Sequence, residues 1–128
     1  MTNTQTKGIN IIIHTFYQSN YSRPMINEFI FGYRITIENH SSYTVQLLSR
    51  FWNITDAFGH SKQVEGLGVV GQQPILEAHQ GFEYTSACHL GTEYGTMSGK
   101  LTFSSLYNDE LFEVDIPRFT LFLPALLN

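Results

Sequence analysis

The sequence contains little that would cross-link the chain, charge its surface or anchor it in a membrane. Cys88 is the one cysteine among 128 residues, so no intramolecular disulfide can form. No apolar run approaches the roughly 20 residues of a membrane-spanning helix, and the N-terminal stretch MTNTQTKG lacks the apolar core of a signal peptide. These absences predict a protein of the reducing cytoplasm that does not bind membranes.

Charged residues are also scarce, at 14% of the sequence against roughly 25% in an ordinary soluble domain. The seven lysines and arginines are scattered along the chain, and the formal net charge is −4. A surface that binds nucleic acid needs a basic stripe to displace counterions from the phosphates, so nucleic acid is not an expected partner. The shortage of charge leaves more uncharged surface than usual, which favours contact with another protein.

Aromatic and β-branched residues are abundant. Ten Phe, seven Tyr and one Trp supply the large side chains that dominate protein cores and interfaces. A chain of this length can bury roughly two thirds of its unfolded surface without a metal or a disulfide. No repeat or linker divides it, so we expect residues 1–8 to form a disordered tail and residues 9–128 to fold as one domain.

Apolar residues recur with a period of two. In residues 29–38 every odd position is apolar, whereas the even positions include Arg34 and Thr36, which predicts a strand with one face on a core. The other predicted strands are residues 9–17, 43–55, 61–65, 82–88, 97–106 and 111–123. The last two flank Asn108-Asp109 and predict a hairpin. A change of phase past Pro117 predicts a bulge or a sheet edge there.

The fold class follows from these strands, because no window shows the spacing of a helix. Short strands at regular intervals predict an all-β, antiparallel sandwich of the immunoglobulin-like or fibronectin type III-like kind, with about seven or eight strands. Trp52, on a central predicted strand, matches the core Trp of such sandwiches, although no cysteine pair accompanies it. A closed barrel is the main alternative.

The most prominent motif is Gly66-Leu67-Gly68-Val69-Val70-Gly71, which matches G-x-G-x-x-G. In a dinucleotide-binding fold these glycines open a helix whose N-terminus holds a pyrophosphate, but nothing helical is predicted to follow here. Two interpretations stay open. The glycines permit positive backbone angles in a tight loop, or successive N–H groups form a nest for an anion. On the second interpretation Gly66, Gly68, Val69, Val70 and Gly71 are candidate anion-binding residues.

No catalytic or metal-binding constellation is evident. None of the five histidines has the ligand spacing of a metal site, so we expect no metal and no cofactor. Cys88 shares a predicted strand face with Phe82 and Tyr84, which favours a buried core thiol over a nucleophile. We therefore predict no catalytic residues and expect that the protein is not an enzyme.

Arg50 stands where the strand pattern expects a core residue. It shares a predicted face with Leu48, Trp52 and Ile54. Its guanidinium can lie on the Trp52 ring or pair with a carboxylate such as Glu38 or Glu83. The alternative is contact with an anion or a partner, which adds Arg50 to the candidate anion-binding residues.

The C-terminal run predicts a second contact surface. Phe119, Leu121 and Leu123 can face the core, whereas Phe122, Leu126 and Leu127 have no obvious burial site within one chain. We expect the latter three to pack against another protein or against a second copy of this chain, which would make a homodimer. The alternative is that they cap the open end of the sandwich.

Several segments together resemble the ApaG family. They are residues 45–56 (VQLLSRFWNITD), 66–74 (GLGVVGQQP), 82–86 (FEYTS), 95–99 (GTMSG) and 116–119 (IPRF), and the resemblance extends from residue 9 to residue 124. It implies a sandwich similar to fibronectin type III domains. It also implies a role associated with cobalt resistance and magnesium efflux, in which a chain without a membrane span could only assist or regulate transport.

The resemblance also bears on partners. Similar domains lie at the end of an F-box protein and of a polymerase-associated protein in eukaryotes, which implies protein binding. The family name links it to a diadenosine tetraphosphate hydrolase, which implies pyrophosphate or dinucleoside polyphosphate ligands at the glycine motif. The first hypothesis is therefore a non-enzymatic module that binds another protein, and the second is a binder of such phosphates. A metal-dependent enzyme is a remote third.

Overall fold

The computed structural model describes residues 2–124, which form nine β-strands and one short 3-10 helix. The strands are β1 (Thr2–Thr6), β2 (Ile9–Tyr17), β3 (Phe29–Asn39), β4 (Val45–Asp56), β5 (Ser61–Leu67), β6 (Ile75–Leu76), β7 (Gly81–Leu90), β8 (Tyr94–Ser105) and β9 (Leu111–Phe122), and the helix η1 (Pro24–Ile26) lies between β2 and β3. No helix in the described residues is long and apolar enough to cross a membrane.

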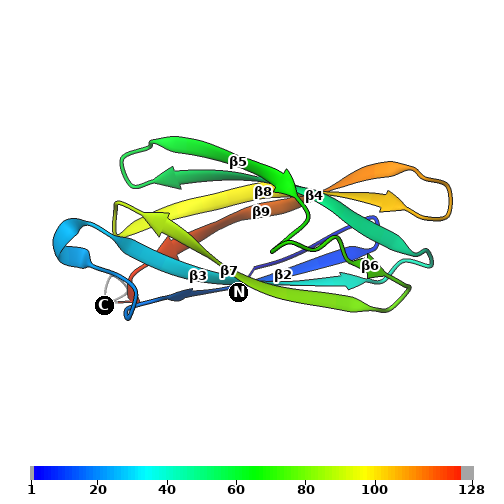
Figure 1. Cartoon of the computed structure of the whole chain (residues 1–128), viewed down its shortest axis with the longest axis horizontal. Coiled ribbons are helices and arrows are strands. Elements are labelled where there is room, and N and C mark those ends of the chain that lie inside the picture. The colour runs from blue at the N-terminus through cyan, green and yellow to red at the C-terminus, as the bar shows by residue number, and fades with distance from the viewer. Residues whose placement is uncertain (1, 125–128) are drawn as a thin grey trace.

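The strands form two antiparallel sheets that stack as the two layers seen in Figure 1. One sheet has the order β1-β2-β3-β7, and the other has the order β5-β4-β8-β9 with the short β6 also paired to β4. The predicted antiparallel sandwich is confirmed. The strands that the sequence did not predict are β1 and β6.

The core lies between the inner faces of the two sheets. Alternate residues of β3, including Phe31, Ile35 and Ile37, are buried from one side, and Leu101 and Phe103 of β8 are buried from the other. Every second residue is buried because successive side chains of a strand point to opposite faces of the sheet, and only one face packs against the core. The apolar faces therefore meet as the alternation predicts.

The expectation of a disordered tail over residues 1–8 is wrong. Thr2–Thr6 is β1, which pairs with β2 from Thr2↔Ile13 to Thr6↔Ile9. The connecting residues Lys7 (φ 49°) and Gly8 (φ 81°) both have positive φ, as a two-residue type I′ hairpin requires. The polar sequence hid this strand because it is an outer strand, which needs few apolar side chains.

A bulge in β4 alters the face that each half of this strand presents to the core. The pairing with β8 shifts between Leu47↔Phe103 and Ser49↔Thr102, which leaves Leu48 as the extra residue. Before the bulge Leu47 is buried, and after it Trp52 is buried. Leu48 is half-buried and does not continue the face of Arg50 and Trp52, so that part of the sequence prediction is wrong.

The predicted features of the C-terminal hairpin are confirmed. β8 and β9 pair across Asn108 and Asp109, and their register shifts between Met97↔Phe119 and Gly99↔Ile116. The shift leaves an extra residue in β9 next to Pro117, where the sequence predicted a bulge. β9 is also the last strand of its sheet, a position that tolerates a missing backbone donor.

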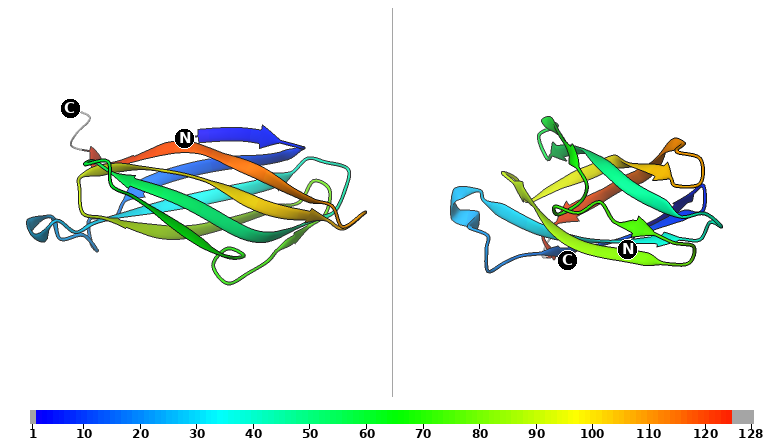
Figure 2. Two further views of the ribbon diagram at one scale, coloured as in Figure 1. Left: turned by 90° about the horizontal axis from the view of Figure 1, so that it is seen from above. Right: turned by 45° about the vertical axis from the view of Figure 1, so that its right-hand side comes forward.

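The two long sides of the sandwich differ. On one side β9 packs against β1 and β2, and Figure 2 shows the N-terminal strand beside β9. On the other side the edge strands β5 and β7 face each other without pairing, and a cleft remains between them. This open side, the loop after β5 and the two ends of the sandwich are the places where function can be sought.

A matched pair of alanine substitutions on β3 tests this assignment of faces. Ile35 is fully buried, so Ile35→Ala should lower the free energy of unfolding by about 2–5 kcal/mol. Thr36 points to the other face, and Thr36→Ala should cost less than about 1 kcal/mol. Urea unfolding of both variants measures the difference, and equal losses would contradict the assignment.

Candidate functional site

The glycine motif begins in the last two residues of β5 and continues into a loop, residues 68–74, that is fastened to the bulge of β4. The Leu48 carbonyl accepts hydrogen bonds from the Gly68 N–H at 2.8 Å and from Gln73 Nε2 at 2.8 Å. The Leu47 N–H donates to the Pro74 carbonyl at 3.0 Å. Because β5 pairs with β4 on one side of the bulge and β6 on the other, the loop spans the point where regular pairing is interrupted.

Within the loop, Val69 to Gln72 form a tight turn. The N–H of each of these two residues donates to the carbonyl of the other, at 2.8 and 2.9 Å. The central residues Val70 and Gly71 have φ of 42° and 79°, which defines a type I′ turn. Val69 has no exposed surface and anchors the loop in the core. A positive φ is unusual for a β-branched residue such as Val70.

The structure explains why two positions of the motif are glycine, and the reason differs between them. Gly68 has a positive φ of 62°, and a Cβ there would collide with the Gln72 carbonyl oxygen. At Gly66 a Cβ would lie 2.7 Å from Nη1 of Arg50, so the absent side chain leaves room for the guanidinium. The tight-loop interpretation therefore accounts for the motif without a ligand.

The loop has fewer free amides than a nest of successive N–H groups would offer. The Gly68 and Val69 N–H groups donate to Leu48 and Gln72, and both of these loop residues are buried. Val70 and Gly71 are exposed. Anion binding by the loop stays a prediction, and it would rest mainly on the Val70 and Gly71 amides and on nearby cations.

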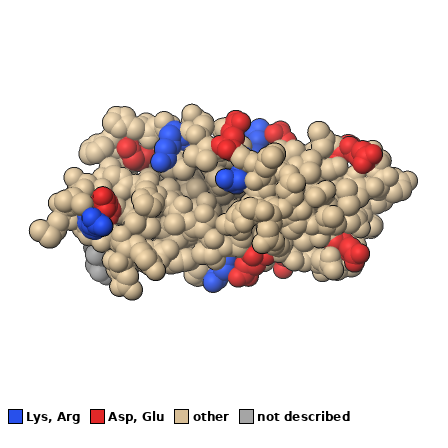
Figure 3. All heavy atoms as spheres, viewed as in Figure 1, with Lys and Arg blue, Asp and Glu red and all other residues tan. Residues whose placement is uncertain are grey.

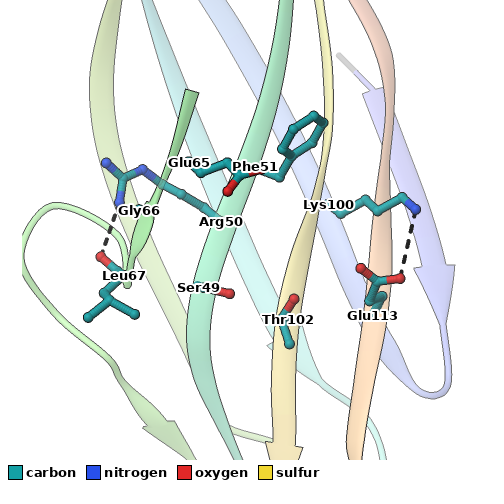
Figure 4. Close-up of a pocket in the computed structure, with 9 residues that line it drawn as sticks. All are labelled: Ser49, Arg50, Phe51, Glu65, Gly66, Leu67, Lys100, Thr102 and Glu113. Carbon is teal, nitrogen blue, oxygen red and sulfur yellow. Dashed lines mark hydrogen bonds and ion pairs between the residues drawn. The ribbon is translucent and has the colours of Figure 1, made fainter. Parts of the chain in front are cut away.

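Arg50 ties β4 to the same loop. Its Nη1 donates to the carbonyls of Leu67 at 3.1 Å and Gly68 at 3.0 Å, and Figure 4 shows the side chain reaching across to Leu67. Of the alternatives that the sequence left open for Arg50, pairing with Glu38 or Glu83 is not found among the described residues, because both carboxylates lie beside other partners. Carbonyl groups suit a half-buried guanidinium, whose planar donors can serve two acceptors at once.

A hollow of about 570 Å³ lies on the outer face of this sheet, beside the loop. Figure 4 shows its lining, with Arg50 and Glu65 at one side and Lys100 and Glu113 at the other. Lys100 Nζ lies 3.7 Å from Glu113 Oε1. On the face shown in Figure 3, acidic and basic side chains are likewise scattered in small groups. The hollow thus holds charges of both signs and favours no anion.

Cys88 on β7 is buried, as its strand face predicts. Burial raises the pKa of its thiol to about 11, against an ordinary value of 9.0, and the Lys62 charge lowers it by a smaller amount. The thiol is therefore protonated at neutral pH, whereas a nucleophile must be a thiolate. Among the described residues, no group of three or more His, Cys, Asp or Glu side chains could hold a metal ion.

Asn39, at the end of β3, organises one end of the sandwich. It has no exposed surface, and its Nδ2 donates to the carbonyls of Tyr43 at 2.8 Å and Leu76 at 3.0 Å. Its Oδ1 accepts from the Ser41 hydroxyl at 2.6 Å. A buried amide satisfied in this way fixes the loops that it joins. In the sequence, the feature that could have indicated this role is an Asn that directly follows a strand of alternating apolar residues.

The C-terminal contact surface is described only in part. Phe122 is half-buried and pairs with Tyr94 at the end of β9. Leu123 packs against the core, as predicted. Leu126 and Leu127 lie outside the described residues, so contact of the three residues with a second copy or another protein stays a prediction.

Comparison with known proteins places this fold and loop in a family. A family model of the ApaG domain matches residues 19–105. Protein ApaG of Brucella anthropi is 48% identical over 119 residues, which cover 93% of this chain and 91% of that protein. Protein ApaG of Brucella canis is 44% identical with the same coverage. A crystal structure of a Bordetella pertussis protein described as ApaA has a TM-score of 0.88 at 40% identity, and it covers 91% of this chain and 94% of that one.

The class of protein that fold and loop define is thus a two-sheet antiparallel sandwich with a glycine loop fastened to a bulged strand. The chain belongs to the ApaG family.

The structural role of the glycines predicts an order of stability losses. Gly68→Ala combines a positive φ with a collision against backbone, whereas Gly71→Ala meets only the positive φ in open space. We expect Gly71→Ala to lower the free energy of unfolding by about 1 kcal/mol and Gly68→Ala by about 2–3 kcal/mol. Gly59→Ala, at φ 87° in open space on a distant turn, is the matched control. Denaturant unfolding measures all three, and a Gly68→Ala variant no less stable than the control would contradict the role.

The buried thiol predicts a loss of stability at alkaline pH. Because the pKa of Cys88 is raised from 9.0 to about 11, the folded state holds this proton more tightly than the unfolded chain. The resulting stability is complete below pH 9 and is lost as the pH rises toward 11, by about 2 kcal/mol. Cys88→Ala should remove this part of the slope. Unfolding curves of wild type and variant that stay parallel above pH 9 would argue against it.

Proposed function

We propose that the protein is a non-enzymatic, cytoplasmic module that binds another protein through the end of the sandwich where Tyr43 and Tyr107 meet. The observation that carries this proposal is a pair of exposed tyrosines beside a pocket. Tyr43 is 52% exposed and Tyr107 is 74% exposed, and their ring centroids are 5.0 Å apart. Tyrosine is enriched at protein interfaces because it offers a large, rigid contact area with a polar tip.

The pocket beside the tyrosines supports binding of a protein side chain. It has a volume of about 320 Å³, and both apolar and polar residues line it. Val45 and Phe112 contribute apolar surface beside the tyrosines, three serines and Asn108 contribute polar groups, and Lys7 and Glu110 supply one charge of each sign. A site of this size and composition fits an apolar anchor residue with a polar rim, which is the usual anatomy of an interaction hot spot.

The loops that carry the tyrosines are held in place before any partner binds. Tyr43 follows the turn that Asn39 fixes through the Tyr43 carbonyl. Tyr107 stands on the β8–β9 hairpin, where the Ser105 N–H donates to the Glu110 carbonyl at 2.8 Å and the Leu106 N–H donates to the Thr44 carbonyl at 2.9 Å. Pre-organised loops lose less conformational entropy on association, which leaves more of the contact energy for affinity.

Protein binding would also explain the association with cobalt and magnesium that the family resemblance implies. We propose that the protein acts on ion homeostasis indirectly, by binding a protein that transports the ions or regulates their transport. Binding at the tyrosine end would leave the glycine loop and the opposite end of the sandwich uncovered. The partner can therefore be separated from other ligands by mutation.

The experiment compares two surface variants. Tyr43→Ser with Tyr107→Ser removes the proposed anchor surface, and Tyr21→Ser removes a 67% exposed tyrosine from the β2–β3 loop, at the opposite end of the sandwich in Figure 1. We expect a bound protein to be captured by wild type and by Tyr21→Ser, and to be captured at least about tenfold less by the double variant, as loss of a hot spot predicts.

The measurement is quantitative mass spectrometry of affinity captures from the native cytoplasm, with thermal unfolding to show that each variant is folded. A partner held equally by wild type and the double variant would contradict the tyrosine end. Capture of no specific protein by any of the three would contradict protein binding altogether.

A further inference from the structure

The open side of the sandwich contains a cleft that neither the glycine loop nor the tyrosine end uses. It has a volume of about 360 Å³ and lies between the edge strands β5 and β7. Its lining includes Tyr33 from β3, Arg50 and Trp52 from β4, Lys62 from β5, and Ser86 and Cys88 from β7. Clefts of this size are large enough for a small molecule.

The charge of the cleft is opposite to that of the whole protein. The formal net charge is −4, yet the lining contains Arg50 and Lys62 and no Asp or Glu. Within the described residues the side-chain hydrogen bonds of Arg50 all leave from Nη1, toward the Leu67 and Gly68 carbonyls. Nη2 and Nε of Arg50, which also lines the cleft, therefore have no acceptor among the described residues.

Buried donors without acceptors lie at the same place. Trp52 lines the cleft and is 2% exposed, and Tyr84, beside Tyr33 on the same sheet face, is 6% exposed. The Trp52 Nε1–H and the Tyr84 hydroxyl have no hydrogen-bond partner among residues 2–124. Such groups are rare, because burying a donor without an acceptor is costly. The Trp52 side chain thus contributes to the wall of the cleft an indole whose N–H has no acceptor among the described residues.

The hydroxyl groups of Tyr33 and Tyr84 remain hydrogen-bond donors across the physiological pH range. Burial raises the pKa of the Tyr33 hydroxyl, whereas the Ser86 hydroxyl and the Arg50 charge lower it. Burial also raises the pKa of Tyr84, and the Arg50 guanidinium acts on it in the opposite direction. Both phenols therefore carry their protons at neutral pH, and the Arg50 charge reaches both.

We propose that this inter-sheet cleft binds a small organic anion, namely an aromatic or other apolar body that carries one carboxylate. The carboxylate is held by Arg50 and the Tyr33 hydroxyl, and Lys62, further along β5 in the lining of the same cleft, adds a second positive charge. The apolar body packs against Trp52, Val64 and Met97, which line the same cleft. This site is separate from the tyrosine end, so the proposal stands independently of the proposed function.

The probe is phenylacetate, and the reporter is Trp52, which is the only tryptophan of the sequence. Phenylacetate should shift the Trp52 indole N–H signal in a ¹H–¹⁵N spectrum in a saturable way and should change the tryptophan fluorescence with the same dissociation constant. The neutral isostere phenylacetamide should bind at least about tenfold more weakly, since it lacks charge-assisted hydrogen bonds. Inorganic phosphate, which lacks the apolar body, should also bind more weakly.

Two conservative variants locate the site. Tyr33→Phe keeps the ring and removes the hydroxyl, and Lys62→Gln removes the charge from an exposed side chain, so each should weaken phenylacetate binding about three- to tenfold while the fold survives. Tyr17→Phe and Lys100→Gln, which alter the same residue types away from the cleft, should leave binding unchanged.

The proposal is overturned if phenylacetate produces no saturable shift of the Trp52 signal, or if phenylacetamide binds as tightly. It is also overturned if Tyr33→Phe and Lys62→Gln bind phenylacetate like the wild type, because the anion would then lie elsewhere. A variant that proves unfolded in its own spectrum is replaced by Ser86→Ala, which removes a further hydroxyl from the lining and should also weaken binding.

Discussion

The bulge at Leu48 is the constraint on which the rest of the structure depends. A regular strand exposes every second residue, so an unbroken β4 could bury either Val45 and Leu47 or Trp52 and Ile54, but not both pairs. One extra residue changes the phase, and all four side chains are buried. Burial of an additional Trp and Ile contributes several kcal/mol by the usual scale of about 25 cal/mol per Å², far more than one interrupted ladder position costs.

The bulge also determines where the glycine loop can be attached. The extra residue lies between the segments of β4 that pair with β5 and β6, and its carbonyl accepts two donors from the loop that joins those strands. Arg50, two residues further on, then reaches the Leu67 and Gly68 carbonyls past Gly66. The glycine motif thus serves contact between loop and strand. In a dinucleotide-binding fold the same glycine pattern allows the loop to contact a pyrophosphate. The surrounding fold therefore determines which of these two roles the motif has.

The rigid sandwich carries two separate surfaces with different chemistry. The tyrosine end is exposed, mixed in charge and built on loops that a buried Asn39 holds. The lining of the cleft between β5 and β7 contains two cations, Arg50 and Lys62, and two aromatic rings, Tyr33 and Trp52, whose centroids are 5.4 Å apart edge to face. We propose a protein partner for the first surface and a small organic anion for the second. Because different residues line the two surfaces, each can be altered without the other.

The sequence by itself determined the fold class, most of the strands, the buried Cys88, the β8–β9 hairpin and the irregularity at Pro117. Alternation of apolar residues and turn chemistry are local properties, and they carry this information without knowledge of strand order. Strand β1 was missed because a polar outer strand has no apolar pattern. The Leu48 bulge was missed because a run of apolar residues such as Val45-Gln46-Leu47-Leu48 fits either phase.

Only the tertiary structure decided the partners of Arg50, the role of Asn39 and the existence of the cleft. Arg50 meets carbonyls 17 and 18 residues away, and Asn39 meets a carbonyl 37 residues away. The cleft joins residues of β3, β4, β5 and β7, which come together only when the two sheets stack with their edges unpaired. Such contacts depend on sheet order and register, and no local pattern in a single sequence encodes those.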